Sequence, residues 1–479
     1  MRSPSPLSPL VCFGGALLAA FVASAAHAAG PHFATGMKIG EVTADSAIVW
    51  TRLTASDQPV PDDGKTAPPK TVADDALDQV PGAAPGMAGQ VRLLISPNAD
   101  FAGARQLPAA SVTEATDFCH QWRIAELQPA TRYHVRAEAL DPSGQVRNHF
   151  DGSFSTAPRP GDWADVRFAA AGCQAYHDRD DPAGLKIYRA MAQAGLDFAA
   201  ITGDDVYYDS DPPNADTVAA ARFHWARMYS QPLLVEFHRR VPSFFEKDDH
   251  DTMKNDSWPP PGPNADRSDE LTGKLNFFKG IRIFREQVPM GEKTYRTFRW
   301  GQGLQIWLTE GRDFRSPNNM ADGPEKTIWG REQLAWLKES ILASDATFRV
   351  LISPTPIVGP DRDKKADNHA NQAFFHEGNA FRQWTKENKL TNLFVCCGDR
   401  HWQYHSVDPA SGLHEFSCGG ASDSHAGGSP GLDPAFHRFH RVKGGFVSGS
   451  ITRADGIPTI TFRHHDVNGK VVYEFQARK

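Results

Sequence analysis

Four short apolar runs, each followed by acidic, histidine or cysteine side chains, constrain the fold of this chain most. The runs lead into Cys173 (VRFAAAGCQ), Asp204 (FAAITGDDVYYD), Asp249 (VPSFFEKDDHD) and His401 (NLFVCCGDRHW). Such runs are typical of buried strands in an α/β protein. Because ligands of α/β proteins gather at the carboxyl ends of the strands, the pattern predicts one site at one edge of the sheets.

The residue types at these strand ends indicate metal binding. Asp204 follows a glycine at a strand end, and its two carboxylate oxygens can each reach a different ion. Tyr207 lies three residues further on, and a phenolate favours a hard trivalent ion. A thiolate at Cys173 would be stabilised by such an ion; the alternatives are a turn with a buried tyrosine and a cysteine packed as a small hydrophobe. We expect two or more metal ions that bind phosphate and activate water.

The DDHD motif, residues 248–251, places three carboxylates beside one histidine. This arrangement is unfavourable without nearby cations, because like charges repel. We expect Asp249 to bind a second ion and His250 to lie beside the leaving group, as an acid or a phosphate donor. Asn255, slightly downstream, is a further oxygen ligand by prediction. The alternative interpretation is a solvated acidic loop.

Two further strand ends complete the predicted site. Asp399 and His401 alternate along an extended segment, so both lie on one side and can each bind a different ion of a pair. Arg312, in EGRDFR after the run LQIWLT, has the planar fork that suits phosphate oxygens. The alternative is that Arg312 and Arg315 pair with nearby carboxylates. Residues 364–384 are expected at the rim of the pocket or in a surface loop.

Composition and termini suggest an exported globular protein. The 479 residues suffice for two or three domains, and a formal net charge of −6 disfavours a nucleic-acid-binding surface. Residues 1–28 have a positive start, an apolar stretch and a small-x-small end, as a secretory signal does, with a membrane anchor as the alternative. We expect periplasmic or secreted protein without a transmembrane anchor after cleavage. Five cysteines then remain, an odd number, and the pairing of four of them stays open.

The pattern of predicted elements changes along the chain. Residues 32–157 read as a small all-β domain that resembles a fibronectin type III sandwich, with a long loop at 56–89. From residue 162 to 479, apolar runs alternate with helices, expected at about 183–194 and 330–343, as in a layered α/β domain. The Asn468-Gly469 pair between two strand patterns predicts a hairpin.

Taken together, the strand-end Cys173, GDDVYYD, DDHD, EGRDFR and GDRHW resemble the PhoD-type alkaline phosphatase/phosphodiesterase family of the calcineurin-like metallophosphoesterases. The resemblance implies a two-sheet α/β/β/α sandwich behind the small β-domain, an Fe(III) site and one or more Ca(II) ions. It implies that the iron is held by Cys173, Asp204, Tyr207 and His401, and that Asp204 also bridges to a second metal held by Asp249, Asn255 and Asp399.

The sequence therefore predicts an exported, metal-dependent hydrolase of phosphate esters that uses metal-activated water. Departures from the family pattern at Asp251, Glu310, Gly311 and Phe314 leave the substrate open. One alternative is a phospholipase D-like phosphodiesterase acting on lipid headgroups. The other is a non-catalytic cell-surface binding protein. The oligomeric state is not predicted.

Overall fold

A computed structural model describes the whole chain apart from residues 2–29, 65–66 and 261–273. The expected signal segment, beyond its first residue, lies outside the described residues. Among the helices of the described part, none has the length and apolar character needed to cross a membrane.

The largest sheet has nine strands and runs through both halves of the chain. Its parallel centre is formed by β9, β10 and β11, whose carboxyl ends carry three of the predicted motifs. In order across the sheet, the strands are β21 (Val471–Arg478), β20 (Ile457–His465), β19 (Phe446–Ala454), β9 (Val166–Ala171), β10 (Phe198–Thr202), β11 (Ser243–Glu246), β1 (Met37–Gly40), β2 (Ala47–Arg52) and β6 (Cys119–Ile124).

A second sheet of seven strands carries the remaining motifs. Its strands, in order, are β12 (Arg296–Trp300), β13 (Leu304–Leu308), β14 (Phe348–Ser353), β15 (Leu393–Cys397), β17 (His414–Cys418), β16 (Gln403–Val407) and β18 (His437–Arg441). The run β13-β14-β15-β17 is parallel. The loops that follow these four strands therefore meet at one edge of the sheet.

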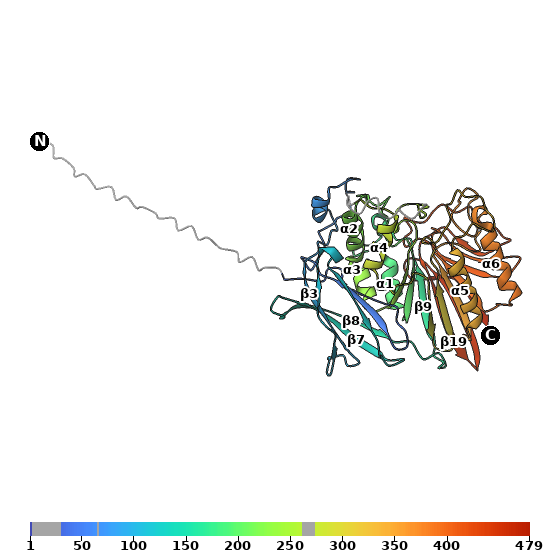
Figure 1. Cartoon of the computed structure of the whole chain (residues 1–479), viewed down its shortest axis with the longest axis horizontal. Coiled ribbons are helices and arrows are strands. Elements are labelled where there is room, and N and C mark those ends of the chain that lie inside the picture. The colour runs from blue at the N-terminus through green and yellow to red at the C-terminus, as the bar shows by residue number, and fades with distance from the viewer. Residues whose placement is uncertain (2–29, 65–66, 261–273) are drawn as a thin grey trace.

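The two sheets pack face to face, and alternation along each strand decides which side chains point inward. In β9, Phe168 and Ala170 belong to the core between the sheets, whereas Ala169 and Ala171 contact the helical layer. That layer covers the outer face of the nine-stranded sheet (Figure 1). Its helices are α1 (Lys186–Gln193), α2 (Val218–Tyr229), α3 (Pro232–His238) and α4 (Phe277–Gln287).

Two helices cover the outer face of the seven-stranded sheet. Helix α5 (Gly330–Ala343) has the bounds predicted from sequence, and α6 (Phe375–Glu387) follows it in the chain. Leu337 and Phe381 pack there against the outward side chains Trp307 and Val395. Figure 1 shows both helices in the gold and orange part of the chain. The predicted α/β/β/α sandwich is thereby confirmed.

The N-terminal region consists of two sheets, and one of them is continuous with the large sheet. Strand β1 runs parallel to β11, with Gly40 opposite Ser243. The other is a separate five-stranded sheet of β4 (Arg105–Gln106), β3 (Gly89–Ser96), β7 (Arg132–Leu140) and β8 (Val146–Ser155), with β5 (Ala110–Val112) paired to β3. Residues 32–157 therefore extend the sheet that carries the site.

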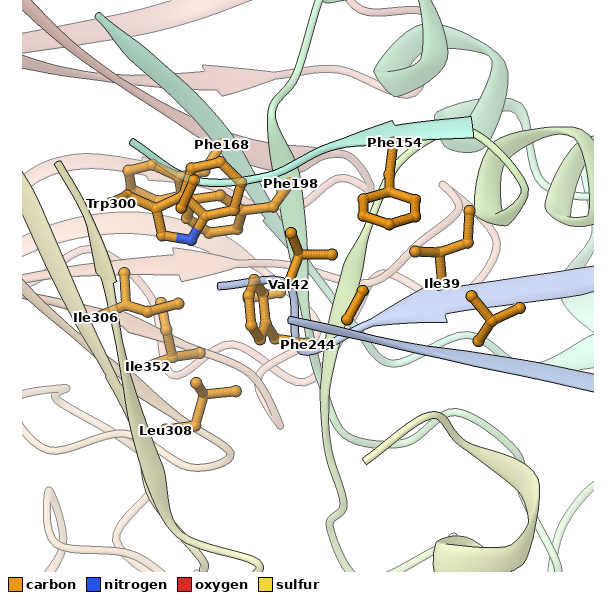
Figure 2. Packing of buried hydrophobic residues seen from close by; sticks show 14 of the residues in the cluster. Ile39, Val42, Phe154, Phe168, Phe198, Phe244, Trp300, Ile306, Leu308 and Ile352 are labelled. Atoms are coloured by element: carbon orange, nitrogen blue, oxygen red, sulfur yellow. The ribbon is translucent and has the colours of Figure 1, made fainter. Parts of the chain in front are cut away.

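One hydrophobic core joins the N-terminal region to the sandwich. Ile39 and Phe154 belong to the same buried cluster as Phe198 and Trp300, with Phe244 between them (Figure 2). The ring of Phe198 lies 5.3 Å from that of Phe244 and 4.7 Å from that of Trp300, measured between centroids. Within the described residues, the two regions therefore share one buried apolar cluster.

Local turn chemistry explains two elements that were predicted from sequence. Helix α1 ends at Gln193, and Gly195 follows with φ of 65°, a left-handed conformation that suits glycine. The hairpin β20–β21 turns at Asn468-Gly469, and the Asp466 carboxylate accepts hydrogen bonds from the backbone amides of Asn468 and Lys470. The hairpin and the end of α1 are confirmed, whereas α1 begins at Lys186, three residues after the predicted start.

Candidate metal centre

The carboxyl ends of β9, β10 and β15 converge, and each ends in an unusual backbone turn. Cys173, Asp204 and Asp399 have φ of 53°, 54° and 61°, the left-handed region that side chains other than glycine rarely adopt. These three residues follow different strands of two sheets but are all predicted metal ligands. Such strain persists only where the surrounding structure enforces it, and it is concentrated at functional sites.

A glycine precedes each of these turns, and close packing requires it at all three. A Cβ atom at Gly172 would lie 2.3 Å from the Thr202 Oγ1 atom. A Cβ atom at Gly203 would lie 2.8 Å from the Cβ atom of Asp248. A Cβ atom at Gly398 would lie 2.5 Å from the Thr202 Oγ1 atom, so the ends of β15 and β10 touch. The motif glycines thus allow loops from both sheets to meet at one point.

Asp204 lies at the centre of the site. Its carboxylate belongs to three groups of ligand atoms. Within each group, the ligand atoms all lie within 4.8 Å of one another. The groups pair it with Cys173 and His401, with Asp249 and His250, and with Asp248 and Asp399. Asp204 Oδ1 is buried without a hydrogen-bond partner. This arrangement suits a carboxylate that is shared between two cations.

Tyr207 joins the first of these groups. Its hydroxyl donates to Asp204 Oδ2 at 3.1 Å, and its oxygen lies 3.4 Å from His401 Nε2. The oxygen, sulfur and nitrogen donors of Cys173, Asp204, Tyr207 and His401 therefore face one small volume. A thiolate, a phenolate, a carboxylate and an imidazole together form a suitable donor set for a transition-metal ion.

Burial makes the anionic forms of this donor set unfavourable in the absence of cations. It raises the pKa of Asp204 to about 8, and it raises the pKa values of Cys173 and Tyr207 well above their ordinary values. Burial also raises the pKa of Asp248 to about 6. A bound cation would reverse these shifts by stabilising the charged forms, so the residues present fit metal ions.

His250 is held between carboxylates at the edge of the site. Its Nδ1 atom lies 2.6 Å from Asp209 Oδ1, and its ring lies 4.3 Å from that of Tyr207. Burial alone would lower the pKa of His250, but Asp249, Asp204 and Asp209 together raise it to about 10. The imidazole therefore carries a proton at neutral pH in the metal-free protein.

Arg312 is completely buried and paired within the protein. Its Nε donates to Asp248 Oδ1 at 2.5 Å, and its Nη1 donates to the Ser257 carbonyl at 3.2 Å. Its Nη2 atom is 3.6 Å from Asp249 Oδ2 and has no hydrogen-bond partner. This burial favours the alternative role weighed from sequence, pairing with a carboxylate, over contact with a substrate phosphate.

The surroundings of Asn255 and Asp399 differ from each other, since Asp399 belongs to one of the ligand groups around Asp204. Asn255 is exposed, and its backbone amide donates to Asp209 Oδ2 at 2.8 Å. Asp399 is partly buried and is contacted by the Arg400 guanidinium. Arg400 also pairs with Asp361 at 2.6 Å, so residues beyond β14 fix the loop after β15.

The polar segment at 364–384 packs against the site and so contributes to its rim. Lys365 Nζ lies 2.6 Å from Asp256 and 3.1 Å from Asp367. Asp367 is fully buried and lies 3.5 Å from Arg400.

His405, in contrast, bonds Tyr473 and His414 within an aromatic cluster of the second sheet. All five cysteines of the described chain are free and buried.

Sequence reasoning missed His425, which lies directly beside the predicted ligands. Its Nε2 atom is 2.8 Å from the Tyr207 hydroxyl, and its ring centroid is 4.1 Å from that of His401. His425 follows β17, which pairs in parallel with β15, so both loops emerge at the same edge. The sequence signal is weak, because the strand HEFSC is short and mixes polar and apolar residues before its glycines and polar loop.

The chain is similar to known phosphatases along most of its length. Residues 168–452 match the PhoD-like phosphatase family, and residues 19–158 match the N-terminal domain of PhoD-like phosphatases. Alkaline phosphatase D of Bacillus subtilis (strain 168) is 24% identical over 433 residues, which is 80% of this chain and 66% of that relative. The chain thus spans just under two thirds of the length of this relative.

Two solved structures share the fold. The structure of PhoD matches with a TM-score of 0.69 and 18% identity, covering 93% of this chain and 88% of that one. The purple acid phosphatase PPD1 from yellow lupin (Lupinus luteus) seeds matches with a TM-score of 0.61 and 12% identity, covering 92% and 73%. At these identities the likeness is one of fold.

Proposed function

The chain belongs to the PhoD-like phosphatase family, whose model matches more than half of it, and we propose that it is an exported, metal-dependent hydrolase of phosphate esters. This match confirms the family that was predicted from the sequence. Phosphatases are hydrolases of phosphoric esters. The observation that carries the proposal is the position of Asp204 in three overlapping groups of ligand atoms. Export is proposed from the composition of residues 1–28.

We assign two metal positions that share Asp204. Cys173, Tyr207 and His401 complete the first, and their thiolate, phenolate and imidazole donors suit Fe(III). Asp249, Asn255 and Asp399 complete the second, and their oxygen donors suit Ca(II). Bound metal ions in such sites polarise the phosphoryl oxygen and lower the pKa of a bound water.

The chain's own residues would position the substrate and move a proton. His250, held at Nδ1 by Asp209, keeps Nε2 available to protonate the leaving oxygen or to bind a phosphate oxygen. In the metal-free protein the carboxylates around it raise its pKa to about 10. Arg312 would act by holding Asp248 and Asp249 in place; a direct contact between Arg312 and phosphate remains a prediction.

The test is metal analysis of the purified chain combined with a substrate panel. We expect metal bound in proportion to protein, and hydrolysis of an aryl phosphate monoester, its diester or both. Phosphatidylcholine in the panel tests the phospholipase D-like alternative. Asp204→Asn should remove metal and activity together. A chain that binds no metal and hydrolyses none of these esters would refute the proposal.

A further inference from the structure

His425 and Asp178 form a pair beside the candidate metal centre that the proposed mechanism does not use. His425 Nδ1 lies 2.8 Å from Asp178 Oδ2, and His425 Nε2 lies 2.8 Å from the Tyr207 hydroxyl oxygen. The side chains of His425 and Asp178 retain only 10% and 17% exposure. The three groups thus form a continuous chain from carboxylate to imidazole to phenol.

The partners of the imidazole determine the direction of its hydrogen bonds. An ionised carboxylate only accepts, so Nδ1 donates its hydrogen to Asp178. The other ring nitrogen, Nε2, then faces the Tyr207 hydroxyl oxygen at 2.8 Å. A carboxylate that binds one ring nitrogen of a histidine fixes the orientation of the whole ring.

The turn that carries Asp178 is held by Asp211. Asp178 ends a single 3-10 turn, Tyr176–Asp178, shortly after the Cys173 turn. The Asp211 carboxylate accepts the backbone amides of Tyr176 at 2.7 Å and of His177 at 3.1 Å. The support of His425 therefore comes from the loop after β9, whereas His425 comes from the loop after β17.

The geometry separates His425 from the ligand groups. Within the described residues, the ligand-atom groups around Asp204 include His401 and His250 but not His425. His425 contacts the site through the oxygen of Tyr207 and lies beside the ring of His401, 4.1 Å away between centroids. A residue placed in this way orients a ligand and does not replace one.

We propose that His425, oriented by Asp178, is a positioning residue that holds the Tyr207 oxygen where it can bind a metal ion at the first position. The inference rests on the proposed function, since it requires Tyr207 to be a ligand. Partners of this kind outside the ligand set typically change metal affinity by about 10–100-fold when removed. His425→Gln and Asp178→Asn should therefore weaken metal binding without removing a ligand.

The test measures Co(II) affinity of the full chain by competition with a chelator. His425→Gln and Asp178→Asn should each weaken binding by roughly 10–100-fold. In a Tyr207→Phe background, adding His425→Gln should change the affinity by no more than about twofold, because its partner is gone. The matched control is His405→Gln, which removes another buried histidine–tyrosine contact, 2.9 Å to Tyr473, in a cluster that contains none of the predicted ligands. The Co(II) affinity of this variant should equal that of the wild type.

Two other results of this affinity measurement would overturn the inference, and a third is decided by a crystal structure. An undiminished loss in the Tyr207→Phe background would make His425 a ligand or a general structural residue. No loss in either single variant would remove its role. If Tyr207→Phe abolishes Co(II) binding altogether, a crystal structure of His425→Gln decides: a displaced Tyr207 oxygen is expected, and an undisplaced one contradicts the inference. A wild-type chain that binds no Co(II) would refute the proposed function as well.

Discussion

The Oδ2 atom of Asp251 accepts a hydrogen bond from the backbone amide of Asp205 at 3.0 Å. Its Oδ1 atom accepts the amide of Asp248 at 2.7 Å. One buried side chain thus ties the loop after β11 to the loop after β10, which carries Asp204. In the DDHD motif, Asp249 and His250 therefore face the candidate metal positions, whereas Asp251 holds the two loops together.

Asp251→Asn should destabilise the fold and loosen both loops. An amide offers one acceptor oxygen where the carboxyl group offers two, so one backbone amide would lose its partner. We expect a loss of about 1–3 kcal/mol in the free energy of unfolding, together with lower metal content, measured by urea unfolding and metal analysis. The control is Asp345→Asn, whose side chain is 90% exposed. Equal stability of the two variants would contradict this role.

Asp204→Ala should abolish metal binding at both positions and with it turnover. The reason is that Asp204 belongs to all three ligand groups. Metal content per chain and hydrolysis of an aryl phosphate are the measurements. Asp216→Ala, an exposed residue of the loop between β10 and α2, is the matched control. Retention of the full metal complement by Asp204→Ala would rule out a shared ligand.

Metal binding should strengthen as the pH rises toward 8. Burial raises the pKa of Asp204 to about 8 in the metal-free protein, so a proton must leave before a cation binds. Because the folded pKa exceeds the unfolded value, this group's contribution to stability is present below about pH 4 and is lost as the pH rises through 8.

The predicted increase of metal binding with pH is tested by the melting temperatures of metal-free and metal-loaded protein at pH 6, 7, 8 and 9. The difference between the two forms should increase with pH and level off above about 8. Asp204→Asn, which is expected to bind no metal, should show no difference in melting temperature between the two conditions at any of these pH values. A difference that stays constant over the range in the wild type would contradict the prediction.

Arg312→Ala should cost stability before it changes substrate affinity. It would leave Asp248 buried without its partner, and breaking a buried pair in this way costs about 3–5 kcal/mol. Arg331→Ala, whose pair with Glu325 is exposed, should cost less than about 1 kcal/mol. Chemical unfolding and the Michaelis constant are measured together. A raised KM at unchanged stability would instead support direct contact with phosphate.

Deleting residues 32–157 should prevent the remaining chain from folding. The deletion removes β1 from the edge of β11 and uncovers Phe244 in the shared core. Expression of residues 162–479 followed by gel filtration and circular dichroism checks this. A monomeric, cooperatively unfolding fragment would show that the catalytic region has an independent core.

The sequence by itself determined the elements and most of the residues of the site. Buried strands, helix α5 and the Asn468-Gly469 hairpin depend on periodicity and turn chemistry within a few residues, so they can be read locally. The strand-end motifs containing Cys173, Asp204 and His401 were found for the same reason, because a loop directly follows its strand.

Tertiary structure alone decided which of these residues meet. Arg312 pairs with Asp248 across 64 residues, and Asp178 supports His425 across 247. The attachment of β1 to β11 likewise depends on strand order, which local patterns do not encode. The physical reason is that hydrogen bonds and burial act between neighbours in space, and the order of parallel strands sets which distant loops become neighbours.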